Sequence, residues 1–428
     1  MSVARPSGNQ DDCAQTISPL NKGLGPMHCP MSAEEIAAQG WNLLADDLSL
    51  PAAVLDENKL KHNLRWMQQF IEAYGARLAP HGKTTMAPKL FAMQLEAGAW
   101  GITMATAHQT RVAHACGVRR VLMANQLVGR QNMEIVASLL RDPAFEYFCL
   151  VDSAQNVNQL GQFFKAKGLR LNVLLEVGME DGRTGVRTRQ QLHEVLAELL
   201  RWKEQIALCG VEVYEGISHD ESVVRDFLQH ATEWAGEIAA QGLIVRQPMI
   251  LSGAGSAWFD IVADIFSQAR IAYPTEVVLR PGCYLTHDVG AYLKAMERIV
   301  QSNPVARRMN ATLKPALQIW AYVHSVPEPA KAIVGLGKRD AAFDSGLPIP
   351  ALHVPQGDSH PVSAPAHWKL TRMMDQHAYL EIAAGDSIHV GDKIAFDILH
   401  PCLTFDKWRY LPVIDARYNV VDVVDTFF

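Results

Sequence analysis

Eight short apolar segments alternate with helical patterns between residues 77 and 279, and this alternation limits the chain to few folds. The segments are Arg77–Ala79, Gly101–Ala105, Arg119–Ala124, Glu146–Val151, Leu169–Val177, Ile206–Tyr214, Met249–Leu251 and Glu276–Leu279. Their β-branched, aromatic and other apolar residues are typical of strands. Eight strands separated by helices predict an α/β fold, a (β/α)8 barrel of the TIM type. A doubly wound open sheet has nearly the same alternation, so periodicity alone leaves it as an alternative.

The segments between these strands carry helical periodicity. Two apolar faces are made by Met86, Leu90, Met93 and Ala97, and by Met133, Val136 and Leu140. Residues spaced in this way lie on one side of a helix. The stretch Glu221–Gln241 predicts a long helix, and Gly242 is placed to end it.

After about residue 300 the pattern changes to strands without intervening helices. These strand patterns are Ala316–Val326, Ala332–Val334, Ile388–Val390, Lys393–Phe396, Tyr410–Ile414 and Asn419–Val424. Residues 341–365, rich in Pro, Gly, Ser and His, predict a long excursion between strands. We therefore expect a barrel over 49–299, a mostly β domain over 300–428, and an N-terminal extension over 1–48 that packs with the β domain.

Composition excludes several classes of function. The chain has 428 residues, 49% hydrophobic and 20% charged, with a net charge of −6, so it has no basic surface for nucleic acid. It also has no apolar run near the roughly 18 residues that a membrane span requires. Met1–Gln10 is polar and lacks the apolar centre of a signal peptide. The seven scattered cysteines indicate reduced thiols and a cytoplasmic protein.

Lys83 is the first residue that points to chemistry. It follows the first predicted strand in the run Pro80–Thr84, which places it at the carboxyl face where barrel enzymes have their active sites. A lysine there can form a Schiff base with an aldehyde. A lone lysine is better explained as a solvated loop residue, and it is the flanking Pro80, His81 and Thr84 that favour a catalytic role.

Further residues on the same predicted face could hold a cofactor. The loop Ser252, Gly253, Ala254, Gly255 and Ser256 joins a strand to a helix, where small residues let backbone N–H groups approach a phosphate. A Schiff-base lysine together with a phosphate loop indicates pyridoxal 5′-phosphate (PLP). Arg183 and Tyr214 also fall at or beyond strand ends, where they could contact the cofactor ring or form an ordinary rim contact.

His400 and Cys402 could bind a metal ion. Residues two apart on an extended backbone share one face, so both side chains can reach one ion. Two ligands are too few for a closed structural zinc site, so other residues, water or substrate would complete the shell. His377 is a candidate neighbour, and a buried Cys beside a hydrogen-bonded His is the alternative.

The order of these segments resembles the fold-type III PLP enzymes, specifically the D-serine dehydratase and D-threonine aldolase branch related to alanine racemase. The resemblance is carried by Pro80–Thr84, Gly178–Val186, Tyr214–Gly216, Ser252–Ser256, Pro281–Tyr284, Gln376–His377 and His400–Cys402. It spans roughly residue 50 to the C-terminus. It implies that Lys83 carries PLP and that His81 belongs to the cofactor site. It also implies that His377 and Tyr284 are neighbours of the substrate or metal.

The resemblance also implies a reaction. His-x-Cys is typical of the dehydratases and His-x-Asp of the aldolases, so His400 and Cys402 predict a Zn²⁺-dependent dehydratase of D-3-hydroxyamino acids; Mn²⁺ or another divalent ion stays open. D-serine, D-threonine or 3-hydroxy-D-aspartate would give a 2-oxo acid and ammonia. A metal-dependent D-threonine-type aldolase is the alternative, and a non-catalytic PLP-binding protein a further one. The family implies a homodimer. The preferred substrate and the remaining metal ligands stay open.

Overall fold

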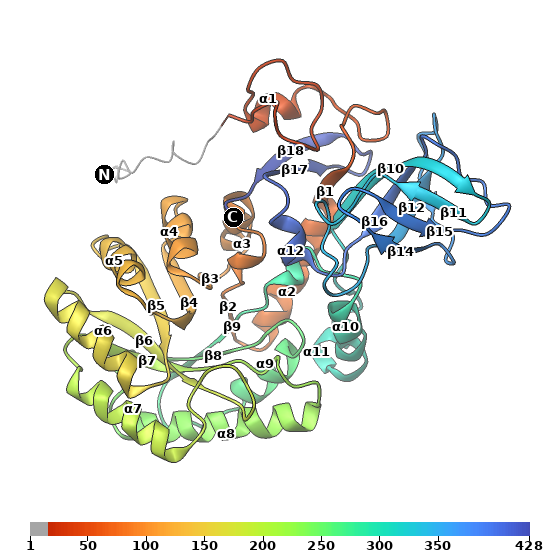
Figure 1. Cartoon of the computed structure of the whole chain (residues 1–428). Helices are drawn as coiled ribbons and strands as arrows, with labels where there is room; N and C mark the ends of the chain where they lie inside the picture. Colours follow the sequence, from red (N-terminus) through yellow and green to blue (C-terminus); the bar gives the residue numbers. More distant parts are fainter. Residues whose placement is uncertain (1–15) are drawn as a thin grey trace, which may run out of the picture.

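The structure is a computed structural model that describes residues 16–428 (Figure 1). The prediction that no signal peptide is present concerns Met1–Gln10 and lies outside the described residues. None of the helices in residues 16–428 combines the length and the apolar character that a membrane crossing needs.

Eight parallel strands form the first sheet, as the sequence predicts. They are β2 (Arg77–Leu78), β3 (Ile102–Met104), β4 (Arg120–Gln126), β5 (Glu146–Val151), β6 (Leu171–Val177), β7 (Ile206–Val213), β8 (Met249–Gly253) and β9 (Thr275–Leu279). The spatial order is β2-β9-β8-β7-β6-β5-β4-β3. A parallel bridge between His81 and Thr103 then joins the segment after β2 to β3, and Thr103 N donates to Pro80 O at 2.8 Å. The barrel prediction is confirmed, and the doubly wound alternative is wrong.

Helices on the outside connect these strands (Figure 1). They are α2 (Glu57–Ala73), α3 (Pro88–Glu96), α4 (Ala107–Ala115), α5 (Arg130–Leu139), α6 (Ala154–Lys167), α7 (Arg189–Arg201), α8 (Glu221–Ala240) and α9 (Phe259–Ser267); α10 (Ala291–Ser302) and α11 (Pro304–Met309) follow β9. Helix α2, which precedes β2, packs beside α9. The Phe70 ring on α2 meets the Phe259 ring on α9 edge-on, with 5.0 Å between ring centroids. The predicted helix end is also confirmed: Gly242, directly after the C-cap of α8, has φ +70°.

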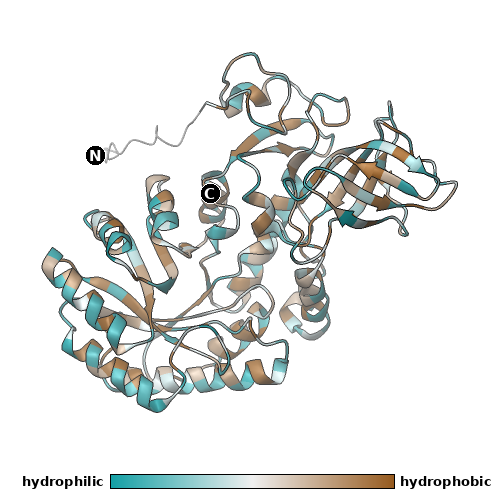
Figure 2. Cartoon of the chain, in the orientation of Figure 1, coloured by the Kyte–Doolittle hydropathy of each residue, from teal (hydrophilic) through white to brown (hydrophobic). Residues whose placement is uncertain are grey.

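The barrel strands are largely apolar, as their brown colour in Figure 2 shows, and their side chains are buried on both sides of the barrel wall. One buried cluster collects alternate strand positions: Ala79, Leu122, Ala124, Phe148, Leu150, Leu174, Ala207, Cys209, Ile250 and Val278. Alternate residues of a strand point to opposite faces, so their neighbours pack in a separate cluster that includes the helices. Both faces of the strands are thus buried, which explains why the strand segments are continuously apolar.

The second domain is built around a mostly antiparallel sheet. Its strands are β1 (Ala52–Asp56), β10 (Leu317–Glu328), β11 (Lys331–Val334), β12 (Ile349–Val354), β13 (Val362–Ser363), β14 (Lys369–Met373), β15 (Ala378–Glu381), β16 (Lys393–Asp397), β17 (Tyr410–Ile414) and β18 (Val420–Asp425). Strand β1 comes from before the barrel and lies between β10 and β17. The short helix α1 (Ala33–Ala37) lies near β18, and Trp41 shares a buried cluster with Trp320.

Two expectations for this domain are wrong. Ile388–Val390 is a loop rather than a strand. Ile388 N donates to Asp386 O at 3.1 Å, and His389 N donates to the carboxylate of Asp392 at 2.9 Å, so these two N–H groups have local partners rather than a neighbouring strand. The excursion over 341–365 contains β12 and β13, and β12 pairs with β16.

The β domain reaches the carboxyl face of the barrel through the short helix α12 (Pro401–Phe405), which follows β16. Helix α12 lies against the 3₁₀ turn Gly82–Thr84. Near the C-terminus, Phe427 N donates to Met86 O at 2.9 Å. The segment 82–86 and residues from 401 to 427 therefore meet at the carboxyl face, where the candidate site lies (Figure 1).

Candidate active site between the barrel and the β domain

A cavity of about 190 Å³ lies where the two domains meet. Its lining residues are His81, Lys83, Thr84, Arg183, Tyr214, Gly255, Ser256, Arg280, Gly282, Cys283, Tyr292, His400 and Cys402. They come from the carboxyl ends of several barrel strands and from α12 of the β domain. The fold therefore brings the predicted lysine and the predicted metal pair into one space.

Lys83 stands on the 3₁₀ turn that follows β2. A Cβ on Gly82 would lie 2.7 Å from both Ile102 Cγ2 and Met104 Cε, so a larger residue would displace these side chains where the turn packs against β3. The Lys83 side chain is left exposed toward the cavity. Beside it, His81 Nδ1 is shielded from solvent and has no partner among the described residues. Burial lowers the pKa of His81 well below its usual range, so the ring is neutral at neutral pH.

Arg183 and Tyr214 form a stacked pair in the cavity wall. The Arg183 guanidinium carbon lies 4.0 Å from the centroid of the Tyr214 ring, a distance at which a cation and a ring face attract one another. Burial raises the pKa of Tyr214, so its hydroxyl stays protonated. The two predicted rim residues thus form one surface.

Only part of the predicted phosphate loop faces the cavity. Gly255 and Ser256 line it. Ser252 is fully buried, and its Oγ donates to Val278 O and accepts from Arg280 Nε, each at 3.0 Å. Gly253 is the last residue of β8, and it and Ala254 lie outside the lining.

Arg280 is a cavity residue that the sequence analysis did not single out. Its guanidinium contacts Glu212 and donates to Val213 O at 3.0 Å. Burial raises the pKa of Glu212 to about 8, against the effect of the Arg280 charge. Arg280 directly precedes Pro281–Tyr284, and that position was the available signal. It places a fixed cation beneath the cavity.

On the opposite wall, His400 and Cys402 are held by three neighbours. Asp344 Oδ2 lies 2.7 Å from His400 Nδ1. Cys402 Sγ lies 3.5 Å from Cys283 Sγ and 3.6 Å from Thr84 Oγ1. The hydrogen bond from the Cys283 thiol, with help from His400, lowers the pKa of Cys402. The thiolate that results is the form that binds metals.

Comparison with known proteins identifies this architecture. The profile of the alanine racemase N-terminal domain matches residues 55–285, more than half of the chain, and that of a serine dehydratase domain matches 316–414. The chain belongs to the alanine racemase N-terminal domain family. The resemblance inferred from the motifs is thereby confirmed.

The relatives of this chain include proteins named as aldolases and a protein named as a dehydratase. The chain is 26% identical to a D-threonine aldolase from Arthrobacter sp over 70% of its own length and 74% of the relative. It is 32% identical to D-threo-3-hydroxyaspartate dehydratase from Delftia sp. (strain HT23), over 32% of this chain and 36% of that protein. The crystal structure of D-threonine aldolase from Filomicrobium marinum covers 90% of this chain and 97% of its own, with a TM-score of 0.75 and 22% identity. That last likeness establishes the fold.

The cavity of this alanine racemase family member suits PLP. The Lys83 side chain is exposed, and His81 Nδ1 has no hydrogen-bond partner among the described residues. A Cβ on Gly282 would lie 2.7 Å from Thr84 Oγ1, so only glycine lets its backbone come this close to the lysine turn. Arg280 supplies buried positive charge beneath the cavity. These features fit an aldehyde cofactor that carries an anionic group.

The donor set also suits a metal ion in an open site. Among residues 16–428, no three His, Cys, Asp or Glu side chains are grouped to hold a metal. If a metal is bound, His400 and Cys402 would contribute two donors, and coordination positions would remain for water or substrate. Imidazole with thiolate is a combination that zinc binds well.

Two predicted neighbours do not line the cavity. His377 is exposed at the turn between β14 and β15, where its carbonyl accepts from Met374 N at 2.8 Å. Tyr284 is buried, and its hydroxyl accepts from Gln94 Nε2 at 3.1 Å. The residue that contacts the His400 ring is Asp344, which stands 56 residues earlier in the chain. No sequence pattern marked that pair.

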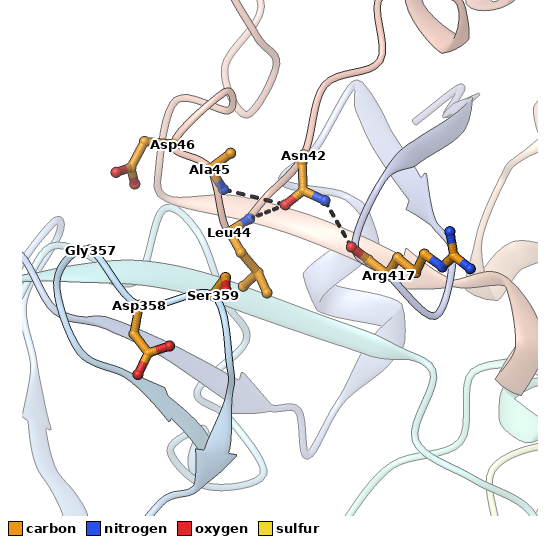
Figure 3. Close-up of a pocket in the computed structure, with 8 residues that line it drawn as sticks. All are labelled: Asn42, Leu44, Ala45, Asp46, Gly357, Asp358, Ser359 and Arg417. Atoms are coloured by element: carbon orange, nitrogen blue, oxygen red, sulfur yellow. Dashed lines mark hydrogen bonds between the residues drawn. The ribbon is translucent and has the colours of Figure 1, made fainter.

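A larger cavity, of about 470 Å³, lies between the segment 42–46 and the β domain (Figure 3). Its lining is Asn42, Leu44, Ala45, Asp46, Gly357, Asp358, Ser359 and Arg417. As Figure 3 shows, the Asn42 amide is used internally, accepting from Leu44 N at 2.9 Å and donating to Arg417 O at 2.8 Å. None of the predicted site residues lines it, so size alone does not mark the active site.

Proposed function

We propose that this chain is a PLP- and metal-dependent lyase of D-3-hydroxyamino acids that releases ammonia and a 2-oxo acid. One observation carries the proposal: Lys83 and Cys402 line the same cavity, and Cys402 Sγ is 3.6 Å from the hydroxyl of Thr84, the residue next to the lysine. An imine-forming amine and a thiolate beside an imidazole serve different chemistries. Their meeting in one cavity suits a reaction that needs both.

Each wall of the cavity has its own part in binding. Lys83 would bond the aldehyde of PLP, while Ser256, whose Oγ accepts from Gly282 N, would offer its hydroxyl to the phosphate. Arg183 and Tyr214 would bound the ring. When bound, PLP withdraws electrons from the α-carbon of an amino acid. His400 and Cys402 would hold zinc, which supplies a Lewis acid for the β-hydroxyl of the substrate.

The protein itself moves the proton. Lys83 Nζ, once free of the cofactor, accepts the α-proton of the substrate. Loss of that proton and of the β-hydroxyl removes one molecule of water and leaves an enamine. One water then hydrolyses its imine form to the 2-oxo acid and ammonia, so atoms and charge balance.

An aldolase is the second candidate. The relative that aligns with 70% of the chain is named a D-threonine aldolase. The same cavity would then deprotonate the β-hydroxyl, and cleavage of the Cα–Cβ bond would yield glycine and an aldehyde. The thiolate ligand and the match to a serine dehydratase domain over 316–414 favour dehydration.

Product analysis with D-threonine separates these reactions, because this substrate can enter both. The purified protein is loaded with PLP and zinc, and L-threonine serves as the stereochemical control. Ammonia with 2-oxobutanoate supports the dehydratase. Glycine with acetaldehyde contradicts it in favour of the aldolase. Turnover of L-threonine at the same rate contradicts the proposed D-specificity.

We also infer that the resident metal is zinc and that the protein is a cytoplasmic homodimer. Thiolate ligation favours zinc over magnesium or manganese, and the family resemblance implies the dimer. Elemental analysis of protein purified without added metal tests the first point. Light scattering after gel filtration tests the second, and a mass near 47.3 kDa would contradict it.

A further inference from the structure

Glu215 is a buried carboxylate that none of the roles proposed above uses. It follows Tyr214 at the end of β7, and it is 0% exposed. Burial raises the pKa of its carboxyl, whereas hydrogen bonds from backbone N–H groups act against that rise. A carboxylate buried away from water is costly unless strong donors satisfy it. The burial of the Glu215 carboxyl group therefore needs an explanation.

The donors to Glu215 are the two amides in the middle of the predicted phosphate loop. Ala254 N donates to Glu215 Oε2 at 3.1 Å, and Gly255 N donates to Oε1 at 2.6 Å. These N–H groups therefore point toward Glu215, which lies outside the cavity lining. The sequence predicts that amides of this loop bind phosphate, yet these two already donate to a carboxyl group of the protein itself.

This contact holds the loop in an unusual conformation. Ala254 has φ +79°, a left-handed geometry that costs a residue with a Cβ roughly 1 kcal/mol or more. On the other side of the loop, Gly282 N donates to Ser256 Oγ at 3.3 Å, and Arg280 N donates to Gly253 O at 3.1 Å. The loop is thus fixed between Glu215 and the Arg280–Gly282 segment.

We propose that Glu215 is a positioning residue for the phosphate of the cofactor. By binding Ala254 N and Gly255 N, its carboxylate fixes the turn that presents Ser256 to the cavity beside Gly282. Glu215 acts on the ligand only through this loop. This role rests on the proposed PLP site. It adds to that site a residue, Glu215, that does not line the cavity itself.

The test compares PLP with pyridoxal, which has the same ring and aldehyde but no phosphate. Glu215→Gln keeps the shape of the side chain, but its NH₂ group faces one of the two N–H donors instead of accepting from it. Loss of a charge-assisted bond to the loop is expected to weaken PLP binding at least about tenfold. The affinity for pyridoxal should stay within about twofold of wild type, since Lys83 and the ring contacts are untouched.

Both affinities are measured by titration of cofactor-free protein, followed by absorbance. Glu233→Gln, an exposed substitution on α8, is the matched control and should change neither affinity. Glu215→Asp keeps the charge but is one methylene shorter, so it should lie between wild type and Glu215→Gln. It also carries the test if the glutamine variant does not fold.

Two results would overturn the inference. If PLP binds Glu215→Gln as tightly as wild type, the carboxylate does not position the phosphate loop. If PLP and pyridoxal weaken by the same factor, Glu215 has only a general structural role. Failure of wild-type protein to bind PLP would instead contradict the proposed function, so the two failures are distinguishable.

Discussion

The two walls of the cavity are built in different ways. One wall, called the lysine wall below, carries Lys83 and is fixed by main-chain hydrogen bonds. Ala79 N donates to Leu279 O at 2.8 Å, and a parallel bridge joins His81 to Thr103. The other wall, called the metal wall below, carries His400 and Cys402 on a loop and a short helix after β16. It is held largely by single side chains, such as the Asp344 carboxylate that contacts the His400 ring. The first wall depends on the barrel, and the second depends on individual long-range contacts. The two should therefore fail separately.

Lys83→Ala should have the largest effect on this comparison. It removes both the Schiff base and the proposed proton acceptor, so kcat with D-threonine should fall by about 10³-fold or more. The visible band of the Schiff base should vanish while bound zinc is unchanged. Steady-state kinetics, absorbance and elemental analysis check the three parts. Loss of zinc along with the band would show that the walls are not independent.

Cys402→Ala should give the opposite pattern. Without the thiolate, zinc should be lost and turnover should fall by about 10²-fold or more, because a Lewis acid contributes several kcal/mol. The Schiff-base band should remain, since Lys83 is untouched and its turn loses only the contact of Thr84 with the thiol while its main-chain bonds to the barrel stay. Cys29→Ala, at an exposed thiol, is the control. Full dehydration by Cys402→Ala after chelation would contradict a catalytic role for the metal.

The same contrast explains how much the sequence could predict. The lysine wall follows local patterns: an apolar strand ends at Pro80, so the position of Lys83 could be inferred from its neighbours. The His400–Asp344 contact could not, because it depends on how a loop 56 residues away folds back. The misplaced strand Ile388–Val390 has a related cause, since the N–H of His389 donates to the carboxylate of Asp392 rather than to a neighbouring strand.

Acid should lower the stability of the fold through one buried histidine. His287 is 2% exposed, and neither ring nitrogen has a partner among the described residues. Burial lowers its pKa to about 4, below the usual value of about 6.5. Between these values the unfolded chain binds more protons than the folded chain, so stability is lost as pH falls through this window.

The His287 contribution can be isolated with His287→Asn, because asparagine tolerates the φ of +51° at this position and does not titrate. Between pH 7 and pH 4, the wild-type free energy of unfolding should fall by about 3 kcal/mol more than that of the variant. Urea unfolding of cofactor-free protein at several pH values gives both curves. Parallel curves would mean that His287 is not the group that titrates.

Asp344→Asn should weaken the metal wall without breaking it. A carboxylate on the second nitrogen of a metal-binding histidine fixes the ring and raises its basicity, and losing it typically costs 10–100-fold in metal affinity. Asp344 lies 2.7 Å from His400 Nδ1, so zinc affinity should fall in that range while PLP affinity is unchanged. Competition with a chromophoric chelator measures the first quantity. Zinc affinity equal to wild type would show that the ring is held by its other contacts.

Lys89→Ala should have the smallest effect, although Lys89 joins the two domains. Its Nζ contacts Asp422 and donates to Val423 O at 3.1 Å, linking α3 to β18. The two charged side chains are 38% and 42% exposed, and exposed pairs contribute roughly 0–1 kcal/mol. The backbone bond from Phe427 to Met86 remains, so zinc and PLP affinities should not change. A loss of stability above about 2 kcal/mol, or weaker zinc binding, would show that surface charge rather than backbone contact holds the metal wall against the lysine wall.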